Sequence, residues 1–197
     1  MATQTRTIVD RTPLIGRNFE AKSNRPLIIG IDPGLSGALA VVDLDSMKLV
    51  DMIDIPVFKK DSKARKQGYM EHLDVHKLSQ IVDIYAPMTS LCVLEEPGAM
   101  PKQGLSSTFR FGHVCGAIHG VMAGHYMTVI PIKPSVWKPS LGLSSNKDDS
   151  RREASVAFRG FSWLWELKKH NDRAEAALLA IYGARYLKGL IDFNRAT

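Results

Sequence analysis

The sequence has few cysteines and no long apolar segment, and each absence excludes a class of protein. Its 197 residues include only two cysteines, Cys92 and Cys115, and their spacing matches neither a zinc motif nor a disulfide framework. We therefore expect two small buried thiols in a reducing compartment. No apolar run approaches the roughly 20 residues that a membrane helix needs. The sequence thus predicts a soluble protein without a membrane partner.

Internal repeats, low-complexity tracts and any sign of a second domain are also lacking. The length suits one domain, which we place at 27–190, between an N-terminal arm at 1–26 and a tail at 191–197. The arm has no helical apolar face and carries five basic residues against two acids. A flexible basic arm is the preferred interpretation, and a transit peptide is the alternative.

Acidic residues are outnumbered by basic ones, with 20 Asp and Glu against 26 Lys and Arg, for a net charge of +6. Such a balance favours a polyanionic partner such as nucleic acid, although charge also serves solubility alone. The densest basic segment runs from Lys59 to Lys66. Its composition predicts a loop that either contacts phosphates or is simply solvated.

The apolar pattern predicts an α/β fold. Three consecutive segments, 27–32, 38–42 and 49–55, are apolar or alternating and predict antiparallel strands. Further strands are expected at 91–94 and 126–130. Helices are expected at 73–85, after Ser106 or Ser107 as N-cap, at 147–158, and from Asn171 or Asp172 onward. This order predicts a mixed five-stranded sheet, its first three strands antiparallel, flanked by helices.

Glycines recur every four residues in the second predicted helix, at Gly112, Gly116 and Gly120. Glycine destabilises a helix interior relative to alanine, so its repeated use needs a reason. We expect this row to pack closely against another helix or against the sheet.

Carboxylates end both strands that are predicted to lie at the centre of the sheet. Asp32 ends the first strand, and Glu95, followed by Glu96, ends the fourth. Asp172 and Glu175 lie one turn apart on the last helix, which places them on one face. If these acids converge, they cannot all stay ionised without cations, and oxygen ligands suit Mg²⁺ or Mn²⁺. Two such ions activate a water molecule and stabilise the leaving oxygen of a phosphodiester.

Each acid also has a purely structural interpretation. Asp32 before Pro33 and Gly34 is a residue that accepts hydrogen bonds from its own turn. One of the two neighbouring glutamates is a solvated charge at a strand end. Asp172 and Glu175 fit the capping of a helix N-terminus. His170 is a ligand, a general base or a surface residue, and the sequence alone does not separate these.

Several motifs in order resemble the RuvC-like Holliday junction resolvases of the RNase H-like superfamily, and particularly their phage-type and plant chloroplast members. The resemblance spans about residues 27–186. The motifs that carry it are Gly30-Ile31-Asp32-Pro33-Gly34, Ser36-Gly37-Ala38-Leu39-Ala40, Leu94-Glu95-Glu96-Pro97, Lys102-Gln103-Gly104, Phe109-Arg110-Phe111-Gly112, Val136-Trp137-Lys138, Lys147-Asp148-Asp149-Ser150-Arg151-Arg152 and Arg173-Ala174-Glu175-Ala176.

The resemblance implies an RNase H-like fold and a homodimer that resolves four-way DNA junctions by paired symmetric nicks. It implies two Mg²⁺ or Mn²⁺ ions per site, with Asp32 bridging them and Glu95 as the second ligand. Asp172 and Glu175 would supply the C-terminal pair. Some relatives have histidine in the last motif, so His170 or Asn171 is an alternative to Asp172, and Glu96 is an alternative to Glu95.

Several basic residues are candidate contacts with DNA phosphates, each of which is otherwise a solvated charge: Lys102, Arg110, Lys133, Lys138 and Lys147. Met100 and Lys102 lie in the loop that relatives insert into the junction core. The aromatic residues Phe109, Phe111 and Trp137 are expected in the core rather than as stacking residues.

Other functions compete with junction resolution. A metal-dependent nuclease for other branched DNA or RNA and a catalytically silent DNA-binding relative are both compatible with the motifs. An actin-like kinase would need a second copy of the fold, which the chain lacks. We expect a cytoplasmic or nucleoid-associated protein, or an organellar one, or one in the host cytoplasm if phage-encoded.

Overall fold

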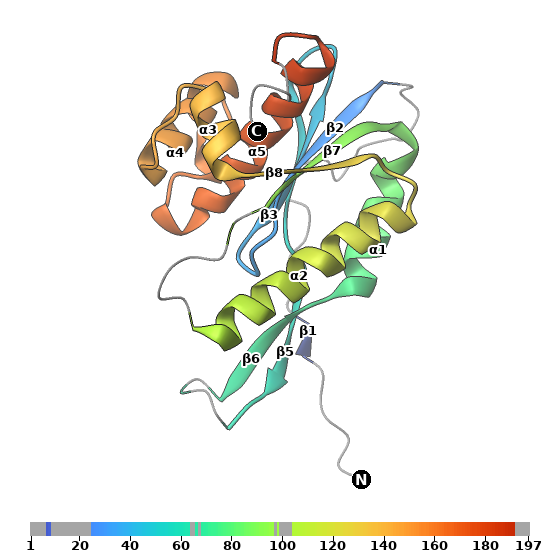
Figure 1. Ribbon diagram of the computed structural model, residues 1–197, viewed down its shortest axis with the longest axis vertical. Coiled ribbons are helices and arrows are strands. Elements are labelled where there is room, and N and C mark those ends of the chain that lie inside the picture. Colours follow the sequence, from blue (N-terminus) through green and yellow to red (C-terminus); the bar gives the residue numbers. More distant parts are fainter. Residues whose placement is uncertain are drawn as a thin grey trace.

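The computed structural model describes residues 25–63, 66, 68–96, 98 and 104–191, together with a short strand at 7–8 (Figure 1). The strands are β1 (Thr7–Ile8), β2 (Leu27–Asp32), β3 (Ala38–Asp43), β4 (Leu49–Asp54), β5 (Val57–Asp61), β6 (Tyr69–Leu73), β7 (Thr89–Glu95) and β8 (Val129–Ile132). The α-helices are α1 (Val75–Tyr85), α2 (Leu105–Gly124), α3 (Pro134–Ser140), α4 (Lys147–Ala157) and α5 (Asn171–Leu187). Short 3₁₀ helices are η1 (Ala86–Met88), η2 (Ser162–Leu164) and η3 (Lys168–His170).

The main sheet has five strands in the order β4-β3-β2-β7-β8. The strands β2, β3 and β4 are successively antiparallel, whereas β7 is parallel to β2 and β8 is parallel to β7. This confirms the predicted mixed sheet and the antiparallel arrangement of its first three strands. The central strand β2 is buried on both faces, which explains why its sequence is a nearly continuous apolar run.

Helices cover both faces of the sheet and create two cores. On one face, Ile28 of β2 belongs to a core that includes residues of α3, α4 and α5. On the other face, Ile29 and Ile31 belong to a core that includes residues of α1 and α2. Figure 1 shows these helices on opposite sides of the sheet. None of the described helices is long and apolar enough for a membrane span.

Helix α5 lies directly against β2 because glycine removes the side chains between them. A Cβ atom placed on Gly30 would lie 2.1 Å from the carbonyl oxygen of Ala176 and 2.3 Å from the amide nitrogen of Ala180. Gly183 repeats this arrangement near the other end of α5, where a Cβ would meet Val93 at 2.6 Å. The close approach fixes the N-terminal turn of α5 beside the end of β2.

The prediction of a loop at Lys59–Lys66 is wrong for its first three residues. They belong to β5, which pairs with β6 in an antiparallel hairpin, and β1 adds a third strand. Apolar residues at the base, Val57 and Leu73, are buried in the core and hold the hairpin to the domain. Tertiary packing therefore overrides the loop-like composition.

Three other local expectations are corrected. The last strand is β8 (Val129–Ile132), which starts later than predicted and contains Pro131 at the sheet edge, where a missing N–H is tolerated. The N-cap of α2 is Gly104, not Ser106 or Ser107. The glycine row does not pack against the other described residues, because a Cβ atom at Gly112 or its repeats would meet none of their atoms within 4 Å.

The predicted arm and tail lie almost wholly outside the described residues, apart from β1, two residues before β2 and Ile191. Both described cysteines are free, Cys92 buried and Cys115 half-buried. Burial raises the pKa of each thiol, to about 11 for Cys115.

Candidate active site

The four acids predicted from the sequence come from three elements, β2, β7 and α5. The two strands end, and the helix begins, at the same end of the sheet. Asp32 is the last residue of β2, and Glu95 is the last residue of the neighbouring parallel strand β7. Asp172 and Glu175 lie in the first turns of α5, which packs on β2. Parallel strands and the glycine contact thus bring these carboxylates together.

Electrostatics show that the four carboxylates are close enough to repel one another. The pKa of Asp32 is raised well above its ordinary value, first by burial and then by the charges of Asp172, Glu95 and Glu175. The pKa of Glu95 is raised to about 7, mainly by burial and by Glu175. Asp32 therefore lies at the electrostatic centre of an acidic cluster, which we define as Asp32, Glu95, Asp172 and Glu175.

Each strand-end acid accepts a hydrogen bond from an N–H group. The backbone N–H of Gly34 donates to Asp32 Oδ1 at 3.3 Å, as the turn interpretation expects. The buried indole of Trp137 donates from Nε1 to Glu95 Oε2 at 2.9 Å. Glu95 is 8% exposed, whereas Glu96 is exposed to solvent. The strand alternation thus resolves which glutamate faces the cluster.

The two helix acids are bound by side chains from other elements. Lys138 Nζ lies 2.8 Å from Glu175 Oε1, and Ser150 Oγ of α4 donates to the same oxygen at 3.1 Å. Ser36 Oγ, in the β2–β3 turn, donates to Asp172 Oδ2 at 2.8 Å. No side chain among the described residues caps the N-terminus of α5. These partners favour a role in the cluster over helix capping.

A bidentate ion pair fixes the start of α5 to the sheet. Arg173 donates from Nε and Nη2 to the two carboxylate oxygens of Asp54 at 2.7 and 2.8 Å. Its Nη1 donates to the carbonyl oxygen of Leu164 in η2 at 3.0 Å. Because Arg173 directly follows Asp172, these bonds set where the acid lies.

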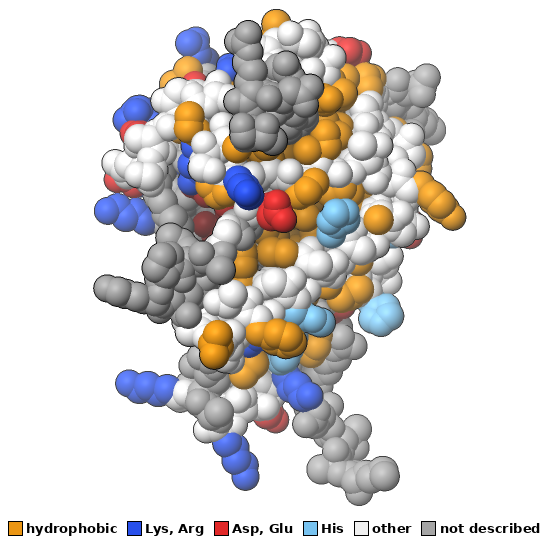
Figure 2. Space-filling view, viewed as in Figure 1, with side chains coloured by type: hydrophobic (Ala, Val, Ile, Leu, Met, Phe, Trp, Pro, Cys, Tyr) orange, Lys and Arg blue, Asp and Glu red, His pale blue; other side chains and the backbone are white. Residues whose placement is uncertain are grey.

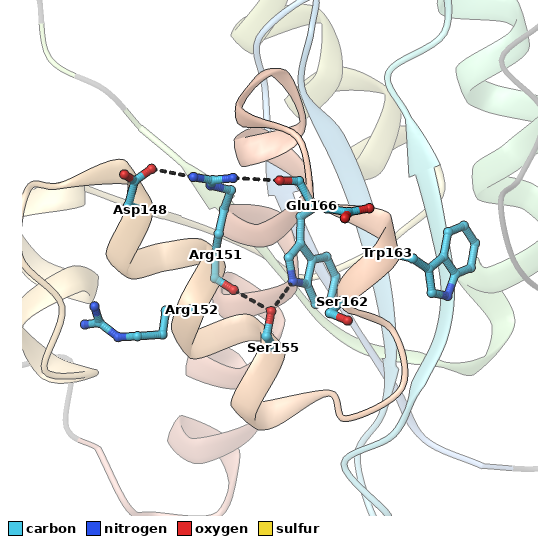
Figure 3. A pocket seen from close by; sticks show the side chains of 8 residues that line it. Asp148, Arg151, Arg152, Ser155, Ser162, Trp163 and Glu166 are labelled. Carbon is cyan, nitrogen blue, oxygen red and sulfur yellow. Dashed lines mark hydrogen bonds and ion pairs between the residues drawn. The ribbon is translucent and has the colours of Figure 1, made fainter.

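A pocket of about 560 Å³ lies between α4 and the segment that precedes α5 (Figure 3). Arg151 spans it, contacting Asp148 and donating from Nη1 to the carbonyl oxygen of Glu166 at 2.9 Å. The indole Nε1 of Trp165 donates to Ser155 Oγ at 2.9 Å. These bonds attach α4 to that segment and so support Ser150 of α4 beside Glu175.

The remaining site candidates are more scattered. His170 has a pKa lowered by burial, Arg173 and Lys169, and its Nδ1 is buried without a partner among the described residues. Asn171 is 2% exposed, and neither amide atom has a partner within that same part of the chain.

The candidate DNA contacts separate into different environments. Lys138 forms an ion pair with Glu175 of the acidic cluster. Lys133 is exposed and Arg110 is half-buried. Met100, Lys102 and the side chain of Lys147 fall outside the described residues. Among the aromatics, Trp137 is fully buried as predicted, Phe111 is half-buried, and Phe109 is 78% exposed, against expectation.

Sequence reasoning missed several groups that hold the acids. Trp137 was expected only as a core residue, although its N–H binds Glu95. Ser36 and Ser150 carry no distinctive spacing, and Arg173 appeared only within a motif. A buried Trp beside a predicted cluster is a usable signal, because its indole N–H needs an acceptor.

The donor set suits a hard divalent cation, since all four cluster residues offer carboxylate oxygens. Within the described residues, however, no three His, Cys, Asp or Glu side chains are grouped closely enough to form a preassembled metal site. Several of the cluster oxygens accept hydrogen bonds from Trp137, Lys138, Ser36 and Ser150.

The sequence matches no family model and no curated protein. Among solved structures, Thermus thermophilus RuvC is similar, with a TM-score of 0.51 and 18% identity over 81% of this chain and 96% of that chain. The same protein in complex with a Holliday junction substrate gives a TM-score of 0.52 and 16% identity, over 82% of this chain and 96% of the other. The chain therefore has the fold of RuvC.

Proposed function

We propose that the protein is a metal-dependent endonuclease that resolves four-way DNA junctions by paired symmetric nicks. The observation that carries this proposal is the acidic cluster, in which Asp172, Glu95 and Glu175 lie near enough to Asp32 to raise its pKa. The fold shared with RuvC, which has been solved in complex with a Holliday junction substrate, supports the junction as substrate. The excess of positive charge suits a DNA partner.

Asp32, Glu95, Asp172 and Glu175 are the residues that would hold two Mg²⁺ or Mn²⁺ ions. Bound in this site, such ions would activate water and stabilise the leaving oxygen of the phosphodiester. Trp137 orients Glu95 through its N–H, and Arg173 sets the position of Asp172. Lys138 partly neutralises the cluster and is placed to contact a phosphate that approaches it. The side chains of the protein therefore contribute by positioning the acids and by balancing charge in the site.

We test this function with a synthetic four-way junction and a linear duplex of the same sequence. In Mg²⁺ or Mn²⁺ the protein should nick the junction at paired, symmetric positions and leave the duplex intact. Equal cleavage of both substrates would contradict junction selectivity, and preferential cleavage of flaps or branched RNA would assign a different structured substrate. Activity in excess chelator would contradict the metal requirement. Junction binding without any cleavage would indicate a catalytically silent relative.

The proposed enzyme acts as a homodimer, because two opposed nicks in a two-fold junction call for a two-fold protein. The exposed face of α2 offers a surface for the second copy. Leu105 and Phe109 are 90% and 78% exposed, and helical spacing places them in line with Gly112, Gly116 and Gly120. Each glycine destabilises an isolated helix by about 1 kcal/mol relative to alanine. Close packing of the second copy's backbone against this glycine row would offset that cost.

The variant Gly116→Arg should convert the dimer into a monomer and abolish the pairing of nicks. A Cβ atom at position 116 would meet no atom of the described residues within 4 Å, so the fold should be retained. Ala157→Arg, at an exposed position on α4, introduces the same side chain elsewhere and should leave the dimer unchanged. Light scattering after size exclusion gives the mass of each variant. A Gly116→Arg dimer would exclude this face, and a monomeric parent protein would contradict the dimer itself.

A further inference from the structure

The β5–β6 hairpin leaves the domain at the same edge of the sheet as the acidic cluster. Asp32 pairs with Ala38 across β2 and β3, and Ala38 pairs with Asp54 across β3 and β4. The hairpin begins at Val57, three residues after Asp54. Each of its strands has five residues, which corresponds to a length of about 17 Å. Figure 1 shows the hairpin projecting beyond the main sheet.

Exposed lysines gather on this hairpin. Lys60, Lys63 and Lys66 are exposed, and none of them forms an ion pair with another residue in the part of the chain that the structure describes. Figure 2 shows Lys and Arg side chains projecting from the end of the molecule where Figure 1 draws β5 and β6. The hairpin therefore presents exposed positive charge to a polyanion.

The positive charge continues from the hairpin toward α2. The pKa of His72, on β6, is lowered first by burial and then by the positive charges of Lys60 and Arg110. Arg110 belongs to the N-terminal half of α2. Lys60 of the hairpin and Arg110 of α2 are thus both close enough to His72 to act on it.

Packing makes the hairpin an ordered support for these lysines. The rings of Phe58 and His72 stack across the strands with centroids 5.5 Å apart. The ammonium group of Lys59 lies 4.1 Å from the centroid of the Tyr69 ring. Pairing with β1 adds a third strand. These contacts order the two strands, so Lys60 of β5 is held on a paired strand, and Lys63 and Lys66 lie in the connection between β5 and β6.

We propose that the β5–β6 hairpin binds the sugar–phosphate backbone of a duplex arm while the acidic cluster engages the strand to be cut. This inference rests on the proposed function, because it takes branched DNA as the substrate. Lys60, Lys63 and Lys66 contact phosphates and carry no base specificity. Duplex DNA presents about one negative charge per 1.7 Å of its axis, so a hairpin of this length spans several phosphates.

The test compares two triple variants in the Asp32→Asn background, which prevents cleavage during binding measurements. The first replaces Lys60, Lys63 and Lys66 by glutamine. The matched control is Lys48→Gln, Arg159→Gln and Lys188→Gln, which removes the same charge from exposed positions away from the cluster edge. Affinity for a four-way junction is measured by fluorescence anisotropy across a series of salt concentrations, and circular dichroism verifies that each variant folds.

The hairpin variant should bind the junction at least about tenfold more weakly near 0.1 M salt. The slope of log affinity against log salt concentration should be smaller in magnitude by about 2.7 than that of the parent, which corresponds to the loss of three phosphate contacts. The control should keep the affinity and slope of the parent within about twofold. Hydroxyl-radical footprinting should show phosphates of one arm that lose protection only in the hairpin variant.

Two results would overturn the inference. If both triple variants weaken binding equally, only the net charge matters and the hairpin has no specific role. If the hairpin variant binds like the parent, the lysines do not contact DNA. Failure of the parent protein itself to bind a junction at any salt concentration would instead overturn the proposed function, and the inference with it. Binding by the parent therefore separates the two failures.

Discussion

Replacing Asp32 with asparagine is expected to reduce cleavage of a four-way junction by at least about 10³-fold, since metal activation of water contributes several kcal/mol to such reactions. Asp32 is the acid whose pKa responds to all three other members of the cluster, so it lies where a shared cation would be held. Asparagine keeps the shape of the side chain and removes the charge. Junction affinity should be retained, because one fewer negative charge faces the phosphates.

Single-turnover cleavage in Mg²⁺ measures this effect, and binding in the absence of divalent ions measures affinity. Asp45→Asn is the matched control, because Asp45 is an exposed acid in the β3–β4 turn. Its cleavage rate should stay within about twofold of the parent. An Asp32→Asn variant that cuts at the parent rate would remove the acidic cluster from the mechanism.

The second large effect concerns the dependence of stability on pH. In the folded protein the pKa of Glu95 is about 7, against an ordinary value of 4.5. Between these two values the folded state binds more protons than the unfolded state, so stability falls as the pH rises from about 4.5 to about 7. A difference of this size corresponds to about 3 kcal/mol for Glu95. The raised pKa of Asp32 acts with the same sign.

Urea unfolding of the parent and of Glu95→Gln at pH 5 and pH 8, without divalent ions, isolates this contribution. The parent should lose about 3 kcal/mol more than the variant on going to pH 8. Added Mg²⁺ should then stabilise the parent at pH 8 and have a smaller effect on Glu95→Gln, because a ligand that binds only the folded state stabilises it. If the free energies of unfolding of the two proteins depend on pH in the same way, the pKa of Glu95 is not raised in the folded state.

The sequence predicts the central strands and the acids at their ends because both leave local signals. β2 is buried on both faces, so its apolar run is continuous and the appearance of Asp32 at its end is conspicuous. The same holds for Glu95 at the end of β7. The spacing of Asp172 and Glu175 is a local signal too, because residues three apart in a helix share one face.

The donors that hold these acids leave no comparable signal. Trp137 and Ser150 are 42 and 25 residues away in sequence from Glu95 and Glu175, the acids they bind. Such contacts exist only once the helices pack on the sheet. The glycine row of α2 shows the same limit, since periodicity identifies one face of a helix but does not identify what covers that face.

The close contact at Gly30 makes the acidic cluster sensitive to mutation of a residue that takes no part in the chemistry. Any β-carbon there would overlap the backbone of Ala176 and Ala180 and push α5, with Asp172 and Glu175, away from Asp32. Among random variants selected for nuclease activity, survivors should keep glycine at position 30 as strictly as they keep the acids. Loss-of-function alleles should accordingly arise in the middle of β2 as well as at its end.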